Sequence, residues 1–461
     1  MNRRQFLRNT FLSIGAAAAP SLYISCQRAV PRPNIIFILT DDQRWDTMGC
    51  AGNKIIQTPN MDALAKDGVL FTNAFVTTAI CGASRASILT GQYERRHGIL
   101  GFGELSDSAN ANTYPMQLKR AGYRTGFIGK YGVGNPPVDQ FDYWRAMTEQ
   151  PVYENRDEHG HYKHYTRICG ENALDFLQTC SKTQPFCLSI SFKAPHVQDG
   201  DPRQFIYDPA YEDLYKDDEI PLPKTAGDTY FHDVFPKFFT ENNEARRRWK
   251  IRFSTHEKYQ ESVKGYYRLI TGVDVVIGEI RKELKKRGHA DNTLIILMGD
   301  NGFYLGEHGM AGKWYGHEES IRVPLIIYDP RLPKGKRGQR RHEISLNIDI
   351  APTILDLAGV TKPESMQGRS LRSLTMGNSQ PWRDEFFYEH RFEHGAVKKS
   401  EGVITLRYKY LRYIDSNPMF EELYDLETDK YEEHNLAADP DHADILSEMR
   451  EKCDVLLEAA K

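Results

Sequence analysis

Cys81 and Arg85 stand four residues apart in a segment that ends with Leu89-Thr90-Gly91. This spacing places them one turn apart on one face of a helix, and Gly91 is a plausible helix stop. Cys81 would then lie at the helix N-terminus, where unpaired N–H groups and the dipole favour an anion. A reactive centre beside a cation suits chemistry that passes through a tetrahedral oxyanion. On these local residues alone, a buried cysteine in an ordinary helix is the simpler interpretation.

Acidic and amide side chains follow two apolar runs that are far apart in the chain. The run from Ile35 to Leu39 leads into Asp41-Asp42, and the run from Leu294 to Met298 leads into Asp300-Asn301. Such runs indicate buried parallel strands, and sites in α/β proteins lie at the carboxyl ends of these strands. Adjacent carboxylates repel each other without a cation, and oxygen ligands suit Ca²⁺ or Mg²⁺. A lone Asp-Asp pair would be a solvated turn by default, but the two strand ends together predict one metal site.

The order Cys-x-Ala-x-Arg, followed by Leu-Thr-Gly, closely resembles the signature of the type I sulfatases. Most members have Pro where this chain has Ala83, and Ala is a known variant. The resemblance implies that Cys81 is oxidised to formylglycine (3-oxoalanine), whose hydrate is the nucleophile. It also implies a bound divalent metal, Ca²⁺ or alternatively Mg²⁺, with the ligands Asp41, Asp42, Cys81, Asp300 and Asn301.

The same resemblance gives catalytic roles to further residues. Lys130 matches a lysine that contacts the sulfate and the nucleophile, and Lys313 matches a second sulfate-binding lysine. His196, which follows an apolar run, matches the histidine that protonates the leaving oxygen. Histidine suits this role because its pKa lies close to neutrality. Arg85 completes the positive field expected around the sulfate, although a lone lysine or arginine would be a surface residue by default.

The chain departs from the family pattern at Gly132, where most members have a histidine two residues after the lysine. That histidine is thought to help expel sulfate by taking a proton from the second hydroxyl of the hydrate. His97 and His308 are candidates for the missing role, and His97, His308 and His317 are candidate substrate contacts. For His308 and His317 the simpler interpretation is loop scaffolding.

Strand-like and helix-like segments alternate between these motifs. This order predicts an α/β fold with a large mixed, mostly parallel sheet flanked by helices, which is alkaline-phosphatase-like by the resemblance. We expect helices from Thr58, over residues 114–121 and over residues 259–288, and irregular structure over residues 197–255. Short alternating segments and a final amphipathic run over residues 441–460 predict a small antiparallel sheet plus helix. The expected domains are a catalytic domain over residues 33–370 and a C-terminal subdomain over residues 371–461.

Residues 1–26 have the pattern of an export signal. A basic start precedes an apolar run from Phe11 to Ala19, which is too short to span a bilayer as a mature helix. Arg3-Arg4-Gln5-Phe6-Leu7 resembles a twin-arginine signal, and Tyr23-Ile24-Ser25-Cys26 resembles a loose lipobox. Cleavage there would lipidate Cys26 and anchor the protein at the cell surface. Cleavage near Ala16–Ala19 would instead give a soluble periplasmic protein, and the sequence leaves both outcomes open.

Net charge and cysteine spacing restrict the classes of partner. The net charge of −3 gives no indication of nucleic-acid binding, so local positive charge must recognise an anion. The seven cysteines include no zinc-type spacing. In an exported protein, Cys169–Cys180 and Cys180–Cys187 are local disulfide candidates, and neither is assigned.

The expected function is therefore a sulfuric ester hydrolase that acts on a sulfated carbohydrate, such as a glycosaminoglycan or another polysaccharide fragment. Its expected partners are this substrate and a maturation enzyme that generates formylglycine. Two alternatives remain. One is a phosphoester or phosphonate monoester hydrolase, because relatives with this fold also use formylglycine. The other is a non-catalytic glycan-binding lipoprotein, because Gly132 replaces a histidine.

Overall fold

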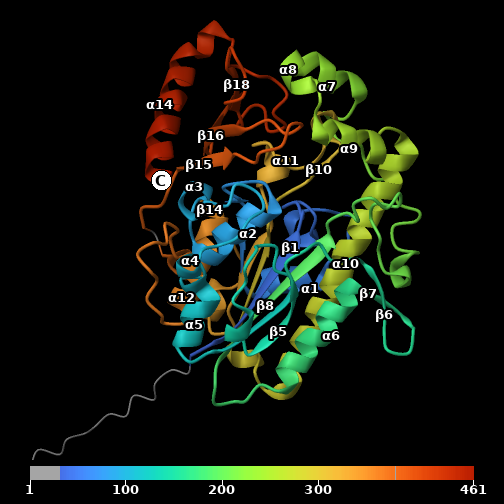
Figure 1. The fold of residues 1–461 in the computed structure, drawn as a ribbon, viewed down its shortest axis with the longest axis vertical. Coiled ribbons are helices and arrows are strands. Elements are labelled where there is room, and N and C mark those ends of the chain that lie inside the picture. The colour runs from blue at the N-terminus through green and yellow to red at the C-terminus, as the bar shows by residue number, and fades with distance from the viewer. Residues whose placement is uncertain (1–31, 379) are drawn as a thin grey trace, which may run out of the picture. The chain divides into compact units, whose positions relative to one another are not determined.

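The computed structural model describes residues 32–378 and 380–461, and an eight-stranded sheet forms its centre (Figure 1). The strand order is β13-β2-β12-β9-β1-β8-β4-β5. All pairs from β9 to β5 are parallel, whereas β12 is antiparallel to both of its neighbours. The strands are β1 (Asn34–Asp41), β2 (Val69–Phe71), β4 (Arg124–Lys130), β5 (Tyr143–Met147), β8 (Phe186–Pro195), β9 (Thr293–Gly299), β12 (Leu325–Tyr328) and β13 (Gln339–Arg341). The predicted mixed, mostly parallel sheet is confirmed.

Helices cover both faces of this sheet, which explains why its central strands are apolar without alternation. Side chains of β1 alternate between two cores: Ile35 and Phe37 belong to one core, and Ile36 and Ile38 belong to the other. The first core includes side chains of α2 (Cys81–Thr90), α5 (Tyr114–Arg120) and α12 (Ile350–Leu357). The second includes side chains of α1 (Pro59–Asp67), α6 (Tyr165–Gln178) and α10 (His256–Arg287). The predicted helices over α1, α5 and α10 are confirmed within a few residues.

The prediction of irregular structure over residues 197–255 is wrong in part. This region contains α7 (Asp228–Val234), α8 (Lys237–Thr240) and α9 (Glu244–Arg252). The Asn243 side chain caps α9 by accepting a hydrogen bond from the N–H of Arg246 at 3.0 Å. Glu244 pairs with Arg248 along the surface of the helix at 2.8 Å. Local polar contacts of this kind support α9, so a search for apolar periodicity misses it.

The C-terminal part contains a second sheet and a long helix. Its four strands pair antiparallel in chain order, and they are β15 (Glu385–His390), β16 (Ser400–Thr405), β17 (Tyr408–Tyr413) and β18 (Phe420–Asp425). With α14 (Ala443–Ala460), they confirm the predicted antiparallel sheet plus helix. Lys409 of β17 binds Glu318 of α11 (Glu318–Ile321) in a buried ion pair of 2.9 Å. Such contacts join the small sheet to the rest of one compact unit, and the boundary near residue 370 stays a prediction.

The cysteines of the described residues are all unpaired, so both disulfide candidates are wrong. Cys169 and Cys187 are buried in apolar cores on different elements. Cys180, just after α6, instead accepts a hydrogen bond from Arg124 at 3.2 Å. The export signal and Cys26 lie outside the described residues, and both stay predictions.

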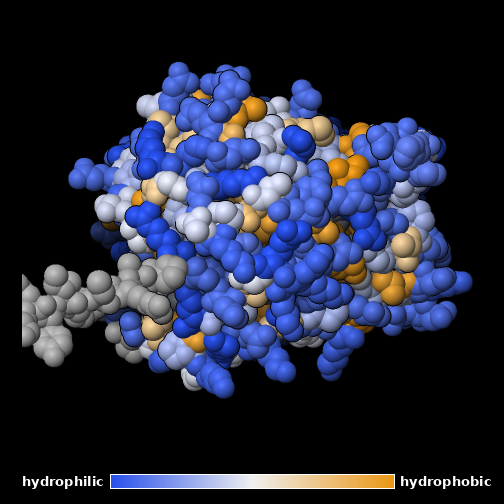
Figure 2. Space-filling view, turned by 90° about the horizontal axis from the view of Figure 1, so that it is seen from below, coloured by the Kyte–Doolittle hydropathy of each residue, from blue (hydrophilic) through white to orange (hydrophobic). Residues whose placement is uncertain are grey.

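The face of the molecule shown in Figure 2 is predominantly hydrophilic, with apolar side chains in small scattered spots. Such spots are normal for a protein surface, and this face shows no broad apolar area for a partner. Within residues 32–378 and 380–461, no helix has the length and apolar character needed to cross a bilayer.

Candidate active site

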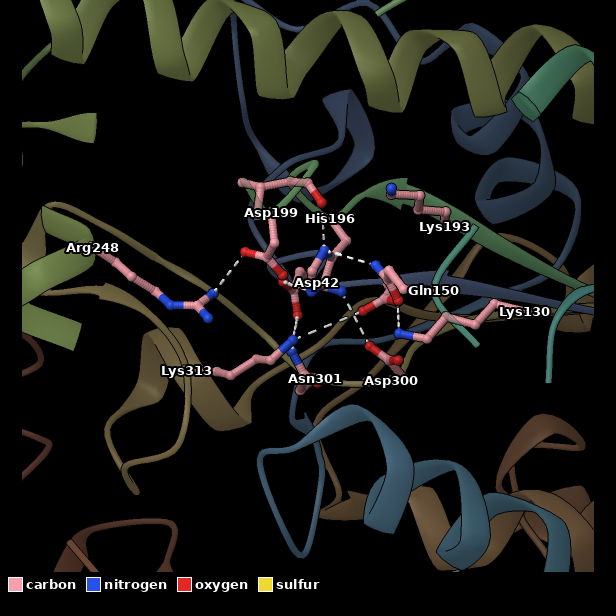
Figure 3. Close-up of polar contacts among 12 residues, drawn as sticks. Asp42, Lys130, Gln150, Lys193, His196, Asp199, Arg248, Asp300, Asn301 and Lys313 are labelled. Carbon is pink, nitrogen blue, oxygen red and sulfur yellow. Dashed lines mark hydrogen bonds and ion pairs between the residues drawn. The ribbon is translucent and has the colours of Figure 1, made fainter. Parts of the chain in front are cut away.

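The pairs Asp41-Asp42 and Asp300-Asn301 lie side by side at the carboxyl end of the central sheet (Figure 3). β1 and β9 are neighbours in register, with Thr40 opposite Gly299, so the residues that follow each strand meet. The N–H of Asp42 donates to Asp300 Oδ1 at 3.1 Å, and Asn301 Nδ2 donates to Asp42 Oδ1 at 2.6 Å. The backbone leaves β1 at Asp42 in the left-handed region, with a φ of 65°. The structure thus brings the predicted metal ligands of both strands together.

This donor set fits a hard divalent cation. The side chains of Asp41, Asp42, Asp300 and Asn301 are at most 1 % exposed. Asp41 Oδ1 and Asn301 Oδ1 are buried without a hydrogen-bond partner, a state that is unfavourable unless another group contacts them. Ring or carboxylate atoms of Asp41, Asp42 and His196 also lie within 4.8 Å of one another. Carboxylate and amide oxygens are the ligands that Ca²⁺ and Mg²⁺ prefer.

Three cationic side chains surround these carboxylates, and each contacts at least one of them. The contacts are Lys130 Nζ to Asp41 Oδ2 at 2.5 Å, Arg85 Nε to Asp300 Oδ2 at 2.8 Å, and Lys313 Nζ to Asp42 Oδ1. The three positive charges balance the three carboxylates. A divalent cation would therefore leave this buried site with a net positive charge, which suits an anionic substrate.

The lysines of this cluster stay charged at neutral pH. Burial opposes the charge, but the Asp41 carboxylate holds the pKa of Lys130 above its ordinary value, and Asp42 does the same for Lys313. Burial, reinforced by Asp41, raises the pKa of Asp300 to about 6. A divalent cation beside Asp300 would lower that pKa again by favouring the carboxylate. Both lysines can therefore bind an anion by charge.

Helix α2 places Cys81 at the same end of the sheet. Its N-cap is Ile80, and Gly91 ends the helix in the left-handed conformation with a φ of 66°, which confirms the predicted helix bounds. A Cβ on Gly82 would lie 2.2 Å from the carbonyl oxygen of Gly101, so the first turn packs directly against a neighbouring loop. The first N–H groups of a helix have no partner within it, and this end of α2 favours a bound anion.

His196 follows β8 and faces Asp42, with Nε2 3.6 Å from Asp42 Oδ2. Its Nδ1 lies 2.7 Å from the carbonyl oxygen of Val197 and also contacts the Gln150 side chain at 2.9 Å. The Val197 carbonyl can only accept and the Gln150 amide nitrogen Nε2 can only donate, so these two contacts favour opposite protonation states of Nδ1. In both states Nε2 is the nitrogen that faces the carboxylates. Burial lowers the pKa of His196, against the attraction of Asp41. Gln150 was not predicted, because it lies in a loop without a motif.

The space beside Gly132 is filled by the Arg85 side chain. Gly132 has a φ of 74°, and a Cβ there would lie 2.7 Å from Arg85 Cδ. Arg85 is itself fixed, because its Nη1 donates to the carbonyl oxygen of Lys130 at 2.5 Å and also contacts Ser191. A histidine at position 132 could not be accommodated while Arg85 keeps these contacts.

Replacing Gly132 with His should therefore impair the enzyme instead of restoring the family pattern. A left-handed backbone costs a non-glycine residue on the order of 1–3 kcal/mol, and Arg85 must also leave Asp300. We expect a lower melting temperature and a loss in kcat/KM of about tenfold or more. Gly122→His is the matched control, because Gly122 has a φ of 88° with nothing near its Cβ. A Gly132→His enzyme that is faster than the natural protein would contradict this account.

The candidate histidines His97, His308 and His317 do not line the cavity that adjoins Cys81, which is described below. His97 Nε2 contacts Ser87 Oγ at 3.0 Å, and burial lowers the pKa of His97 to about 3. His308 and His317 stack with ring centroids 4.6 Å apart, and His308 Nε2 lies 3.6 Å from Glu319. His308 and His317 are buried and His97 is half-buried, and these positions suit scaffolding and give no support to direct substrate contact. The structure therefore assigns none of the three to the role left open at Gly132.

A cavity of about 220 Å³ adjoins Cys81, His196 and Lys313. Its other walls come from residues that the sequence analysis did not single out, namely Ile80, Phe102, Asp199, Glu244, Arg248, Trp314, Phe392, His394 and Val397. Most of them lie in loops or in α9, where no motif or regular spacing marks them. The cavity is therefore lined both by predicted catalytic residues and by residues that were not predicted.

Acidic and amide side chains at strand ends, a buried helix N-terminus and a cationic pocket suit an ester hydrolase of the alkaline-phosphatase-like α/β class. Residues 33–360 match the model of the sulfatase family. Residues 306–459 match the model described as N-sulphoglucosamine sulphohydrolase, C-terminal. The chain belongs to the sulfatase family and is a sulfuric ester hydrolase.

Similar proteins span almost the whole chain. An N-acetylglucosamine-6-O-sulfatase of Bacteroides thetaiotaomicron is 31% identical over 502 residues, which cover 94% of this chain and 86% of the relative. A protein solved in complex with its substrate, D-glucosamine-2-N,6-O-disulfate, has a TM-score of 0.77 and 29% identity, with 93% of this chain and 97% of that chain covered. The phosphonate monoester hydrolase of Agrobacterium radiobacter shares the fold, with a TM-score of 0.72 and 24% identity over 93% of this chain and 96% of that chain.

Proposed function

We propose that this sulfatase removes a sulfate ester from a sulfated saccharide, with formylglycine derived from Cys81 as its nucleophile. The observation that carries the proposal is the cavity in which Cys81, His196 and Lys313 meet beside the carboxylate cluster. The relatives support the substrate class, because one is named for N-acetylglucosamine 6-O-sulfate and another was solved with a sulfated glucosamine. A glycosaminoglycan or another polysaccharide fragment would supply such a sugar.

Sulfate binding would depend on Lys130, Lys313 and Arg85 together with the N-terminus of α2. These groups are buried, so their charges act through little water and stabilise an anion strongly. Asp41, Asp42, Asp300 and Asn301 would hold Ca²⁺ or Mg²⁺. When bound, that ion supplies Lewis-acid stabilisation of the sulfate oxygens.

The residues also suit the two ends of the bond that breaks. Cys81, once oxidised and hydrated, presents an oxygen nucleophile at the cavity, and Asp300 is available as a base for its proton. His196 is available to protonate the leaving sugar oxygen through Nε2. Burial keeps the pKa of His196 low in the free protein, and the anionic ester would raise it by favouring the charged ring.

The proposal extends to maturation and location. A formylglycine-generating enzyme would oxidise Cys81, and residues 1–26 would direct export. The mature protein would then be periplasmic or would be a lipoprotein anchored through Cys26 at the cell surface.

Sulfate release from a panel of defined sulfated saccharides tests the function. The matured protein should release inorganic sulfate from at least one sugar sulfate faster than it releases phosphate or phosphonate from aryl analogues. Faster hydrolysis of the phosphorus esters would favour the alternative of a phosphoester or phosphonate monoester hydrolase. Binding of sulfated sugars with no release across the panel would contradict catalysis.

Replacing His196 with Ala should slow the enzyme in a way that depends on the leaving group. A sugar alkoxide is a poor leaving group, so loss of the general acid should cost about 10²- to 10⁴-fold in kcat. Nitrophenolate leaves without a proton, so hydrolysis of nitrophenyl sulfate should fall by about tenfold or less. Steady-state rates on both substrates check this, and equal losses on both would rule out the acid role.

A further inference from the structure

Asp199 and Arg248 form an ion pair on the wall of the cavity, away from the carboxylate cluster. Arg248 Nη1 lies 3.3 Å from Asp199 Oδ1, and Figure 3 shows the guanidinium directed at this carboxylate, which lies beside His196. Glu244 fixes the other side of Arg248 by accepting from its Nε at 2.8 Å. The guanidinium also lies over the Trp314 ring, 5.0 Å from its centroid. Arg248 is thus held in place before any ligand arrives.

Both members of this pair can be reached by a ligand. The Asp199 side chain is 51% exposed and the Arg248 side chain is 23% exposed, whereas the sulfate-binding lysines are almost fully buried. A carboxylate accepts hydrogen bonds from hydroxyl groups, and a guanidinium donates to their oxygens. Side by side, they complement two neighbouring hydroxyls of a sugar ring.

Both carboxylates of this wall are compensated by arginines. Asp199 pairs with Arg248 and lies 3.8 Å from Arg252, and Glu244 pairs with Arg248 and Arg247. Neutral hydroxyls can therefore bind at the exposed sides of Asp199 and Arg248 without leaving a charge unpaired.

The size of the cavity suits one sugar ring. The start of α2, the loop after β8, α9 and the loop between β15 and β16 all contribute walls, through Cys81, Asp199, Arg248 and Phe392. A space of about 220 Å³ between these walls has room for one sulfated ring that contacts the Asp199–Arg248 pair.

We propose that Asp199 and Arg248 bind two neighbouring free hydroxyls of the sugar that carries the sulfate. This inference rests on the proposed function. It makes the pair a determinant of substrate specificity, with Glu244 as a positioning residue that orients Arg248.

The test compares a sulfated monosaccharide with an aryl sulfate that lacks sugar hydroxyls. For Arg248→Ala and Asp199→Asn, kcat/KM for the methyl glycoside of N-acetylglucosamine 6-sulfate should fall by about 100-fold. The ratio of this kcat/KM to that for nitrophenyl sulfate should fall at least tenfold in both variants. Arg203→Ala is the matched control, because Arg203 forms an exposed pair with Asp201 at 2.7 Å and does not line the cavity. This control should keep the ratio of the natural protein.

Deoxy sugars complete the test. Removing one recognised hydroxyl should slow the natural enzyme, and the same removal should have little further effect in Arg248→Ala. An unchanged ratio in both variants, or equal losses on deoxy sugars in the natural protein and in Arg248→Ala, would overturn the inference. Failure of the natural protein on every sulfate ester would instead contradict the proposed function.

Discussion

Replacing Cys81 with Ala should reduce sulfate release by at least about 10⁴-fold while the fold is retained. Cys81 begins α2, is 3% exposed and lines the cavity with Lys313 and His196. Alanine is a good helix former and is smaller than cysteine, so the helix should still form. It lacks the Sγ atom that is lost when Cβ is oxidised to the aldehyde, so no formylglycine can form. The binding cations remain, so inorganic sulfate should still bind. Rates of sulfate release, thermal unfolding and calorimetric titration with sulfate measure the three expectations.

Cys50→Ala is the matched control for this variant, because Cys50 is partly buried in the short helix Gly49–Ala51 and does not line the cavity. It should keep the natural rate. Mass spectrometry of the peptide that contains Cys81, taken from protein made with a maturation enzyme, should show the aldehyde. An undiminished rate in Cys81→Ala would refute the assignment of the nucleophile, whatever the modification state.

The fold could be predicted from the sequence wherever burial produces a regular pattern of apolar residues. The apolar runs of β1 and β9 are buried on both faces, so each shows as an uninterrupted strand signal. Helix α10 has a long apolar stripe and was predicted within a few residues. By contrast, α9 is stabilised through its cap and its surface ion pairs. Its sequence has no such stripe, so it was missed.

The centre of the site was predictable for a related reason. Parallel strands bring their carboxyl ends to one edge, so Asp42 and Asp300 had to meet if both runs were neighbouring strands. The rim was not predictable, because Asp199 and Arg248 are brought together by loop conformations that no spacing rule encodes. The sequence could not show that the Arg85 side chain fills the space beside Gly132. The structure does show it.

Removing the divalent cation should lower the rate by at least about 10³-fold and also lower the melting temperature. Without the ion, the carboxylates of Asp41, Asp42 and Asp300 cancel the three cations, and little net attraction for an anionic ester remains. A ligand that binds only the folded state stabilises it by about 4 kcal/mol at a concentration 1,000 times its Kd. Dialysis against a chelator, followed by assays and thermal unfolding with and without added Ca²⁺ or Mg²⁺, measures both effects.

Asp41→Asn separates metal binding from the ion pair that Asp41 also makes with Lys130. If Asp41 is a ligand, this variant should need a higher Ca²⁺ concentration to reach half of its own maximal activity and stability. If Asp41 only neutralises Lys130, the maximal rate changes while the Ca²⁺ dependence does not. Asp139→Asn, at an exposed carboxylate in the loop after β4, should leave both quantities unchanged. Full activity in protein that elemental analysis shows to be free of divalent metal would contradict the assigned ligands, because the buried oxygens of Asp41 and Asn301 would then need another partner.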